Sequence, residues 1–236
     1  MRKIAKPIIE LSGINHITKK AAVERFSLSL PTGDTYAVLH KSPQDISMLI
    51  DIIAGKQPKS GKIFFRGDDI TGTKNSFGVI RSSSSLPKKT VCDFASSIII
   101  RRGLSRATTD VLVRKELTGF GLSESADKNI AKLDAEQAEQ AVVFGAYMCS
   151  HELIVIDEPF ARLEEKERLH MIEWLDKLRH DKNVSLLIFT ENLATALALS
   201  DCVMTVGKGC ESKGIIAVDK KKERAEEKLR ELYDSL

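Results

Sequence analysis

The sequence predicts an α/β protein built on a parallel sheet, with short strands and turns at its start and a small helical lobe in its middle. Three observations predict this class. Short apolar or alternating runs, broken by turn residues, fill the first third of the 236 residues. Charged residues recur every few positions in the middle third, as in a small helical lobe. The last third alternates helical and strand-like segments, which is typical of a parallel sheet covered on both faces.

The first third is expected to contain four short strands. They cover residues 7–11, 22–30, 35–40 and 62–65. Turn residues separate them, including Ser12-Gly13 and the PTGD segment at 31–34. Residues 47–54, SMLIDIIA, are compact and apolar, begin with a serine and stop at Gly55, which predicts a helix.

The remaining elements follow from periodicity. Helices are predicted at residues 94–102, 107–119, 126–133, 136–150, 164–180 and 193–199. Strands are predicted at residues 153–156, 184–190, 202–206 and 215–218. The run LIVI at 153–156 has the continuous apolar character of a buried parallel strand.

A chain of this length and pattern is expected to be one domain. Residues 1–86 and 138–218 would form its core, and 87–137 an inserted helical subdomain. The tail, residues 219–236, carries mixed charge and is expected to be a solvated surface helix.

Composition excludes several classes of function. With 36 Lys and Arg against 33 Asp and Glu, the net charge of +3 is too small, and 6% aromatic residues too few, to indicate nucleic-acid binding. The four cysteines show no metal-ligand spacing and are expected to be reduced thiols. No apolar run reaches the roughly 18 residues that span a bilayer, and no signal peptide is expected at the start. We therefore expect a soluble cytoplasmic protein.

The candidate site lies where two strands of the expected sheet end, because ligands of α/β sheets bind beyond the carboxyl ends of strands. One is the strand at 35–40, and the other is the strand at 153–156, which leads into Asp157 and Glu158. An acidic pair in this place can hold Mg²⁺ against a phosphate and polarise a water molecule. The alternative is that the pair caps a helix beginning near Ala161.

Two segments resemble an ATP-binding cassette (ABC) transporter ATPase subunit. Residues 37–71 resemble the opening of its nucleotide-binding domain, and LIVIDEPFARLEE at 153–165 resembles its Walker B motif and D-loop. The run KLDAEQAEQAVVFGAYMCSHE at 132–152 matches the family's signature helix in position. The resemblance extends from about residue 7 to 218. It implies the P-loop-NTPase-like ABC fold, an α/β fold with a mixed or parallel sheet core, an N-terminal antiparallel β part and an inserted helical subdomain. ATP and Mg²⁺ are the ligands of an intact member.

The Walker A position departs from the family pattern GxxGxGK[ST]. It is occupied by His40, Lys41, Ser42, Pro43, Gln44, Asp45, Ile46 and Ser47. In an intact motif the glycines let consecutive backbone N–H groups surround phosphates, and the lysine supplies positive charge. Here Pro43 lacks an N–H group, Asp45 adds negative charge, and Ile46 replaces the lysine. Each lost charge-assisted contact is worth roughly 1.5–3 kcal/mol, so tight nucleotide binding is not expected. Lys41 is the candidate substitute for the missing lysine.

The other family motifs depart in the same direction. Ser82 replaces the Q-loop glutamine, Glu191 replaces the switch histidine, and no aromatic residue is found near Ile17 or Thr18 to stack on adenine. The signature LSGGQ is replaced by Leu133, Asp134, Ala135, Glu136 and Gln137. Only Asp157, Glu158 and Gln137 keep the family's residues. The expected result is a site that repels phosphate instead of stabilising its charge, since Asp45, Asp134, Glu136 and Glu191 are all gained.

Three functions follow from the resemblance. The first is a catalytically inactive structural or regulatory partner of a complete ABC ATPase subunit and a membrane permease, peripheral to the inner face of the cell membrane. It needs no cofactor. The second is an active subunit that binds ATP and Mg²⁺, with Asp157 as the metal ligand. The third is a soluble interaction module of the same fold.

Residues 98–100, which are all isoleucine, are expected in the core of the helical lobe. The alternative is that they line a groove for the permease's coupling helix.

Overall fold

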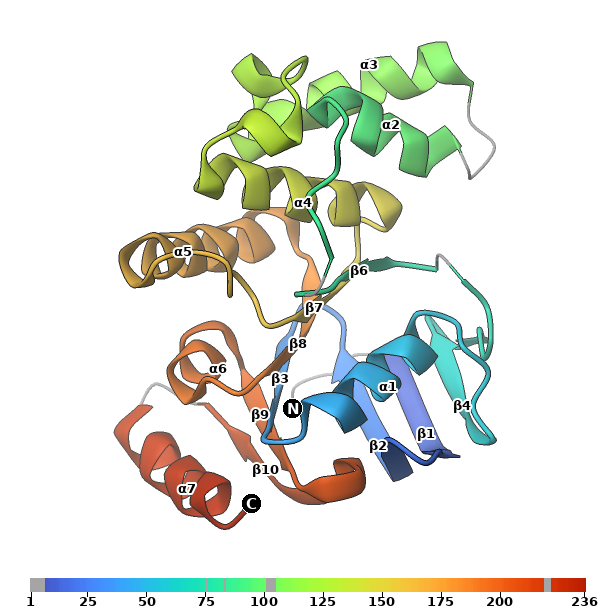
Figure 1. The fold of residues 1–236 in the computed structure, drawn as a ribbon, viewed down its shortest axis with the longest axis vertical. Helices are drawn as coiled ribbons and strands as arrows, with labels where there is room; N and C mark the ends of the chain where they lie inside the picture. Colours follow the sequence, from blue (N-terminus) through green and yellow to red (C-terminus); the bar gives the residue numbers. More distant parts are fainter. Residues whose placement is uncertain (1–6, 75, 83, 101–104, 219–221) are drawn as a thin grey trace, which may run out of the picture.

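The computed structural model describes residues 7–236 except 75, 83, 101–104 and 219–221. Residues 1–6, on which the expectation of no signal peptide partly rests, lie outside the described residues. So do the ends of the segments expected to be helical at 94–102 and 219–236. Figure 1 shows a central sheet, a second sheet beside it, and a group of helices above both.

The central sheet has six strands in the order β10-β9-β3-β8-β7-β6. They are β3 (Thr35–His40), β6 (Gly78–Ile80), β7 (Leu153–Asp157), β8 (Ser185–Thr190), β9 (Cys202–Val206) and β10 (Ser212–Ala217). All pairs are parallel except β9 with β10. Because β8 lies between β3 and β7, the carboxyl ends of these three strands are neighbours, as the candidate site requires. β6 was not predicted, because a three-residue run carries no periodic signal.

The second sheet confirms the antiparallel part at the start of the chain. Its order is β2 (Ala22–Pro31), β1 (Pro7–Ile17), β4 (Ser60–Phe65) and β5 (Asp68–Asp69). The expected turn at Ser12-Gly13 is wrong, because β1 continues through it. The register shifts between Leu11 and Ile14, and Gly13 has a φ of 59°, so the glycine forms a bulge instead of ending the strand.

Seven α-helices are found among the described residues. They are α1 (Pro43–Ile53), α2 (Val91–Ile100), α3 (Arg106–Leu117), α4 (Ala135–Cys149), α5 (Glu165–Lys182), α6 (Leu193–Leu199) and α7 (Lys222–Asp234). The helix expected at 126–133 is not formed, and only a 3₁₀ turn at Ile130–Lys132 is present. The Asn129 side chain accepts a hydrogen bond from the Ala131 N–H group, and Asn129 pairs with Thr90 in an isolated bridge. These local bonds compete with an α-helix.

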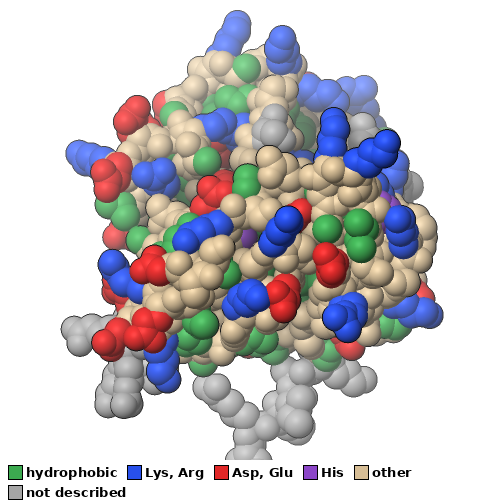
Figure 2. Space-filling model, turned by 60° about the horizontal axis from the view of Figure 1, so that its bottom comes forward, with side chains coloured by type: hydrophobic (Ala, Val, Ile, Leu, Met, Phe, Trp, Pro, Cys, Tyr) green, Lys and Arg blue, Asp and Glu red, His purple; other side chains and the backbone are tan. Residues whose placement is uncertain are grey.

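The core forms two apolar clusters on the two faces of the central sheet. One joins the sheet to α2, α4 and α5, and the other joins it to α1 and the antiparallel sheet. All six positions of β8 are buried, as a central parallel strand requires. None of the described helices combines the length and apolarity needed to cross a membrane. On the face shown in Figure 2, basic and acidic side chains are interspersed, without a basic stripe for a nucleic-acid backbone.

Candidate functional site

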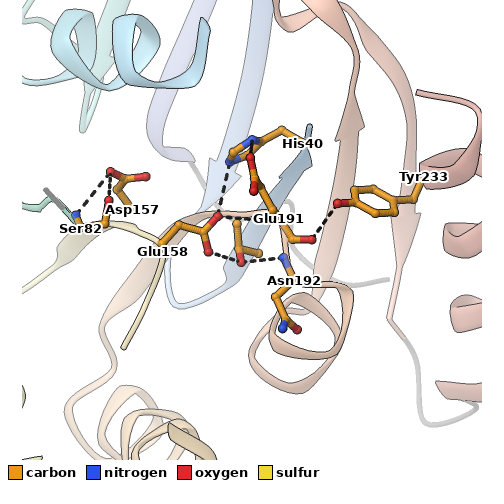
Figure 3. A network of polar contacts seen from close by, with 8 residues as sticks. His40, Ser82, Asp157, Glu158, Glu191, Asn192 and Tyr233 are labelled. Carbon is orange, nitrogen blue, oxygen red and sulfur yellow. Dashed lines mark hydrogen bonds and ion pairs between the residues drawn. The ribbon is translucent and has the colours of Figure 1, made fainter. Parts of the chain in front are cut away.

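The loops that follow β3, β7 and β8 meet at one edge of the central sheet. They bring together His40, Glu158 and Glu191, with Asp157 and Ser82 beside them (Figure 3). The structure therefore assembles the predicted Walker A, Walker B, Q-loop and switch positions in one place.

The loop between β3 and α1 consists of two residues, Lys41 and Ser42. The helix expected to begin at Ser47 begins instead at Pro43, whose fixed φ suits the first turn and whose missing N–H group costs nothing there. The Ile46 N–H group donates to the Ser42 carbonyl at 3.2 Å. It is therefore part of the helix and is not available to a phosphate.

Asp45, which is expected to add negative charge at this position, is also hydrogen-bonded within the chain. It is 5% exposed, and its carboxylate accepts hydrogen bonds from Ala22 N (2.7 Å), Ser42 Oγ (2.7 Å) and Gly209 N (2.9 Å). Burial alone would raise its pKa, but the hydrogen bonds outweigh burial and lower the pKa below its usual 3.8. Asp45 thereby ties α1 to β2 and to the turn after β9.

Replacing Asp45 by alanine is expected to lower the free energy of unfolding by about 3 kcal/mol at neutral pH, because two buried N–H groups lose a charged partner. Since the pKa of Asp45 is lower in the folded state, its contribution is present above pH 3.8 and is lost as the pH falls through the folded-state pKa. Urea unfolding of wild type and Asp45→Ala at pH 7 and near pH 3 tests this. The difference between them should be smaller at the lower pH, and a difference that grows on acidification would contradict the assignment.

His40 lies between two carboxylates. Its Nε2 is 3.8 Å from Glu158 Oε1, and its Nδ1 is 3.8 Å from Glu191 Oε1. The residue is 2% exposed, and neither ring nitrogen has a hydrogen-bond partner among the described residues. Burial lowers the pKa of His40 to about 4, so the ring is neutral at physiological pH. His40 therefore adds no positive charge to this edge of the sheet.

Glu158 is held by the strand next to its own. Its carboxylate accepts hydrogen bonds from Thr190 Oγ1 at 2.9 Å and Glu191 N at 2.6 Å. Burial, which outweighs these bonds, raises the pKa of Glu158. The interpretation of the acidic pair as a helix cap near Ala161 is wrong. The next helix, α5, begins at Glu165 and has a capping box formed by Glu164 and Glu167.

Asp157 is hydrogen-bonded to the residue at the Q-loop position. Ser82 donates to Asp157 Oδ2 from its hydroxyl at 2.9 Å and from its N–H group at 3.4 Å. The space beside the pair is about 10 Å³, about enough for one water molecule. No group of three or more His, Cys, Asp and Glu side chains in the described chain is placed to hold a metal ion.

The residues at the signature position lie at the start of α4 and are bonded within the chain. Asp134 caps the helix, with its carboxylate accepting from Gln137 N at 2.8 Å. Glu136 pairs with His170 Nδ1 at 3.0 Å. Both carboxylates therefore have partners in the chain itself.

Two features of the site were missed by sequence reasoning. Arg162 donates to Glu139 Oε1 at 2.7 Å and to the Ser84 carbonyl at 2.6 Å, which links the loop after β7 to α4 and to the segment after β6. Glu139 is 5% exposed, and a glutamate among apolar residues of a buried helix face is a signal for such a partner.

The second missed feature is the contact of α7 with the site. The Lys41 ammonium, the expected substitute for the lost lysine, lies 4.4 Å from the centroid of the Tyr233 ring. The Tyr233 hydroxyl donates to the Glu191 carbonyl at 2.9 Å. The expectation of a wholly solvated tail is wrong, since Leu229 is fully buried.

A groove lies between α2, α4 and β6. It has a volume of about 260 Å³, and its lining includes Phe94, Ile98, Ile80 and Val142. Ile99 is buried in the core as expected, and Ile98 lines the groove. The expectation is wrong for Ile100, which is 39% exposed near the end of α2.

Comparison with known proteins points to a single family. The family model described as ABC transporter matches residues 23–161. The chain is 27% identical over 208 residues to a spermidine/putrescine import ATP-binding protein of Mesoplasma florum, covering 83% of this chain and 59% of the relative. It is 30% identical over 220 residues to a sulfate/thiosulfate import ATP-binding protein of Chromobacterium violaceum, covering 86% and 60%. The chain thus spans about 60% of the length of these relatives.

Solved structures agree with the fold. A crystal structure of the ADP conformation of an ATP-binding cassette of an ABC transporter has a TM-score of 0.80 at 19% identity, covering 98% of this chain and 100% of that one. A nucleotide-free cassette has a TM-score of 0.78, covering 96% and 98%. The predicted fold class is confirmed.

Proposed function

We propose a function from one premise, which is that the chain belongs to the ABC transporter family. Within this family we assign it the role of an ATP-binding-type subunit that does not hydrolyse ATP. It acts as a structural or regulatory partner of a complete ABC ATPase subunit and a membrane permease, and is peripheral to the inner face of the cell membrane through them. The relatives named above are import proteins, which supports an import system.

The observation that carries this proposal is the β3–α1 connection. Only Lys41 and Ser42 separate the strand from the helix, so this connection is too short to surround a phosphate with consecutive N–H groups. Ile46, at the lysine position, is 1% exposed and belongs to the apolar core. Asp45, in the first turn of α1, is hydrogen-bonded to the backbone of the chain itself.

The electrostatics of the site support the same conclusion. A triphosphate at this edge would lie near the carboxylates of Glu158 and Glu191, with a neutral His40 between them. Oxygen anions are not stabilised by such a set of groups. The residues present therefore do not fit a bound Mg-nucleotide, and no step of hydrolysis is assigned to them.

The groove between α2, α4 and β6 supports a permease partner. Its partly apolar lining and volume of about 260 Å³ suit the insertion of a few side chains of a partner. In the proposed complex this groove receives the permease, and the second ATPase subunit supplies hydrolysis.

One observation favours the second candidate, an active ATPase. Asp157 and Glu158 persist at the end of β7 in the Walker B arrangement. Their hydrogen bonds to Ser82, Thr190 and Glu191 give them a structural role that does not require catalysis.

Titration calorimetry with MgATP tests the proposal. No saturable binding is expected up to about 1 mM nucleotide, which corresponds to a binding free energy weaker than about −4 kcal/mol. A complete cassette subunit measured in the same buffer serves as the positive control. A dissociation constant at or below about 10 μM, near −7 kcal/mol, would contradict the proposal.

A further inference from the structure

The C-terminal part of α7 contacts both loops that frame the candidate site. Tyr233 donates its hydroxyl to the carbonyl of Glu191 in the β8–α6 loop at 2.9 Å. The same ring lies 4.4 Å from the ammonium of Lys41 in the β3–α1 loop, within the range of a cation–π interaction. Figure 3 shows Tyr233 pointing from α7 toward Glu191. One side chain thus joins two loops that lie beside each other at the ends of the paired strands β3 and β8, and adds to the contact of His40 with Glu191.

The helix that carries Tyr233 is anchored. Leu229 is fully buried and Ala225 is 5% exposed, both in the core cluster of the central sheet. Leu232 lies over Gly214 of β10, where an added Cβ would be 3.0 Å from its Cδ1. Leu236 lines, with Lys41 and Ser42, a groove of about 310 Å³ beside the start of α1. Tyr233 is therefore held over the loops by the packing of its own helix.

The chemistry of the contact is stable over the physiological pH range. Burial raises the pKa of Tyr233, and the negative charges of Glu191, Glu158 and Asp234 add to this effect. The phenol therefore remains protonated and keeps its donor.

We infer that α7 is an intramolecular clasp, acting through Tyr233, that holds the β3–α1 and β8–α6 loops together without a ligand. This inference rests on the proposed function, since the resemblance implies that in an intact family member both loops contact one phosphate. In this chain the aromatic ring and hydroxyl of Tyr233 take over that connection. Displacement of α7 would release both loops at once, which makes the helix a conformational control element of the site.

Hydrogen exchange of the full chain, followed by mass spectrometry, tests the clasp. The peptides of interest span residues 36–46 and 187–195. Tyr233→Ala is expected to accelerate exchange in both peptides about tenfold, since loss of the clasp frees both loops to open locally. Trypsin should also cleave faster after Lys41. The matched control is Glu231→Ala, an exposed substitution on the same helix, which should change neither peptide.

Two further variants separate the contacts and keep the test valid if Tyr233→Ala does not fold. Tyr233→Phe removes the hydroxyl and keeps the ring, so exchange should rise only in peptide 187–195. Lys41→Met removes the charge and keeps the stem, so exchange should rise only in peptide 36–46. Rates that stay within twofold of wild type in these variants overturn the clasp.

Nucleotide binding by Tyr233→Ala distinguishes the clasp from the function on which it rests. With both inferences correct, exchange rises and MgATP still gives no saturable calorimetric signal. Faster exchange with tight MgATP binding supports the clasp and overturns the proposed loss of nucleotide binding. Unchanged exchange without MgATP binding overturns the clasp alone.

Discussion

Replacing Ile46 by lysine is expected to lower the free energy of unfolding by at least about 4 kcal/mol and to create no nucleotide binding. This change restores the family's Walker A lysine at its own position. Ile46 is 1% exposed and lies in the apolar cluster that joins α1 to the two sheets, so the new ammonium would be buried without a partner. The loss combines the apolar contacts of isoleucine with the desolvation of a charge.

Urea unfolding and MgATP calorimetry on the same samples measure this effect. Ile46→Leu keeps volume and polarity and should cost less than about 1.5 kcal/mol. Ser47→Lys adds the same charge at the exposed neighbouring position and should change stability by less than about 0.5 kcal/mol. A stable Ile46→Lys variant that binds MgATP would mean that the β3–α1 connection is still a nucleotide loop.

The second large effect is a contrast between two subunits of the proposed complex. Glu158→Gln is expected to leave ATP hydrolysis by the assembled complex within about twofold, whereas the matching substitution in the complete ATPase subunit should abolish it. The glutamine amide keeps the shape and an acceptor for Thr190 Oγ1 or Glu191 N. Steady-state hydrolysis and transport by the reconstituted complex, with each subunit substituted in turn, provide the measurement.

A tenfold loss from Glu158→Gln, about 1.4 kcal/mol of transition-state stabilisation, would show that Glu158 is catalytic, provided assembly is unchanged. Stability gives an independent readout. Burial raises the pKa of Glu158 in the folded state. Protonated Glu158 therefore contributes to the free energy of unfolding at low pH, and this contribution is lost as the pH rises through the folded-state pKa. Glu158→Gln places an uncharged side chain at this position, so the variant should be at least as stable as wild type at neutral pH.

The strands and helices of the central sheet were largely predictable, because apolar runs such as the β7 segment carry their own signal. The start of α1 was not predictable, because a proline is compatible with two local structures. It breaks the interior of a helix but fits the first turn, and the sequence around Pro43 does not say which applies. The bulge at Gly13 was missed for a similar reason, because a glycine marks either a turn or an irregular strand.

Within the site, sequence reasoning identified the positions but not the partners. The sequence presents Asp45 as an added charge, yet its carboxylate binds Ala22 and Gly209, which lie 23 and 164 residues away. No local pattern contains such a pair. The contact of Tyr233 with Glu191 spans 42 residues and comes from a helix with mixed charge, a pattern that indicates only solvent exposure.

The hydrogen bonds among Thr190, Glu158, Glu191 and Tyr233 have a consequence for thermodynamic linkage. A protein that binds a ligand in its folded state gains about 2.7 kcal/mol of stability at one hundred times the dissociation constant, and loses it as the ligand is depleted. Under the proposed function, this chain binds no nucleotide and its loops are contacted by its own side chains, so we expect its folding free energy to be independent of the nucleotide concentration. In an energy-starved cell the complete ATPase subunit of the proposed complex would lose the stabilisation that ATP provides, while this subunit would keep its stability and a folded surface for reassembly.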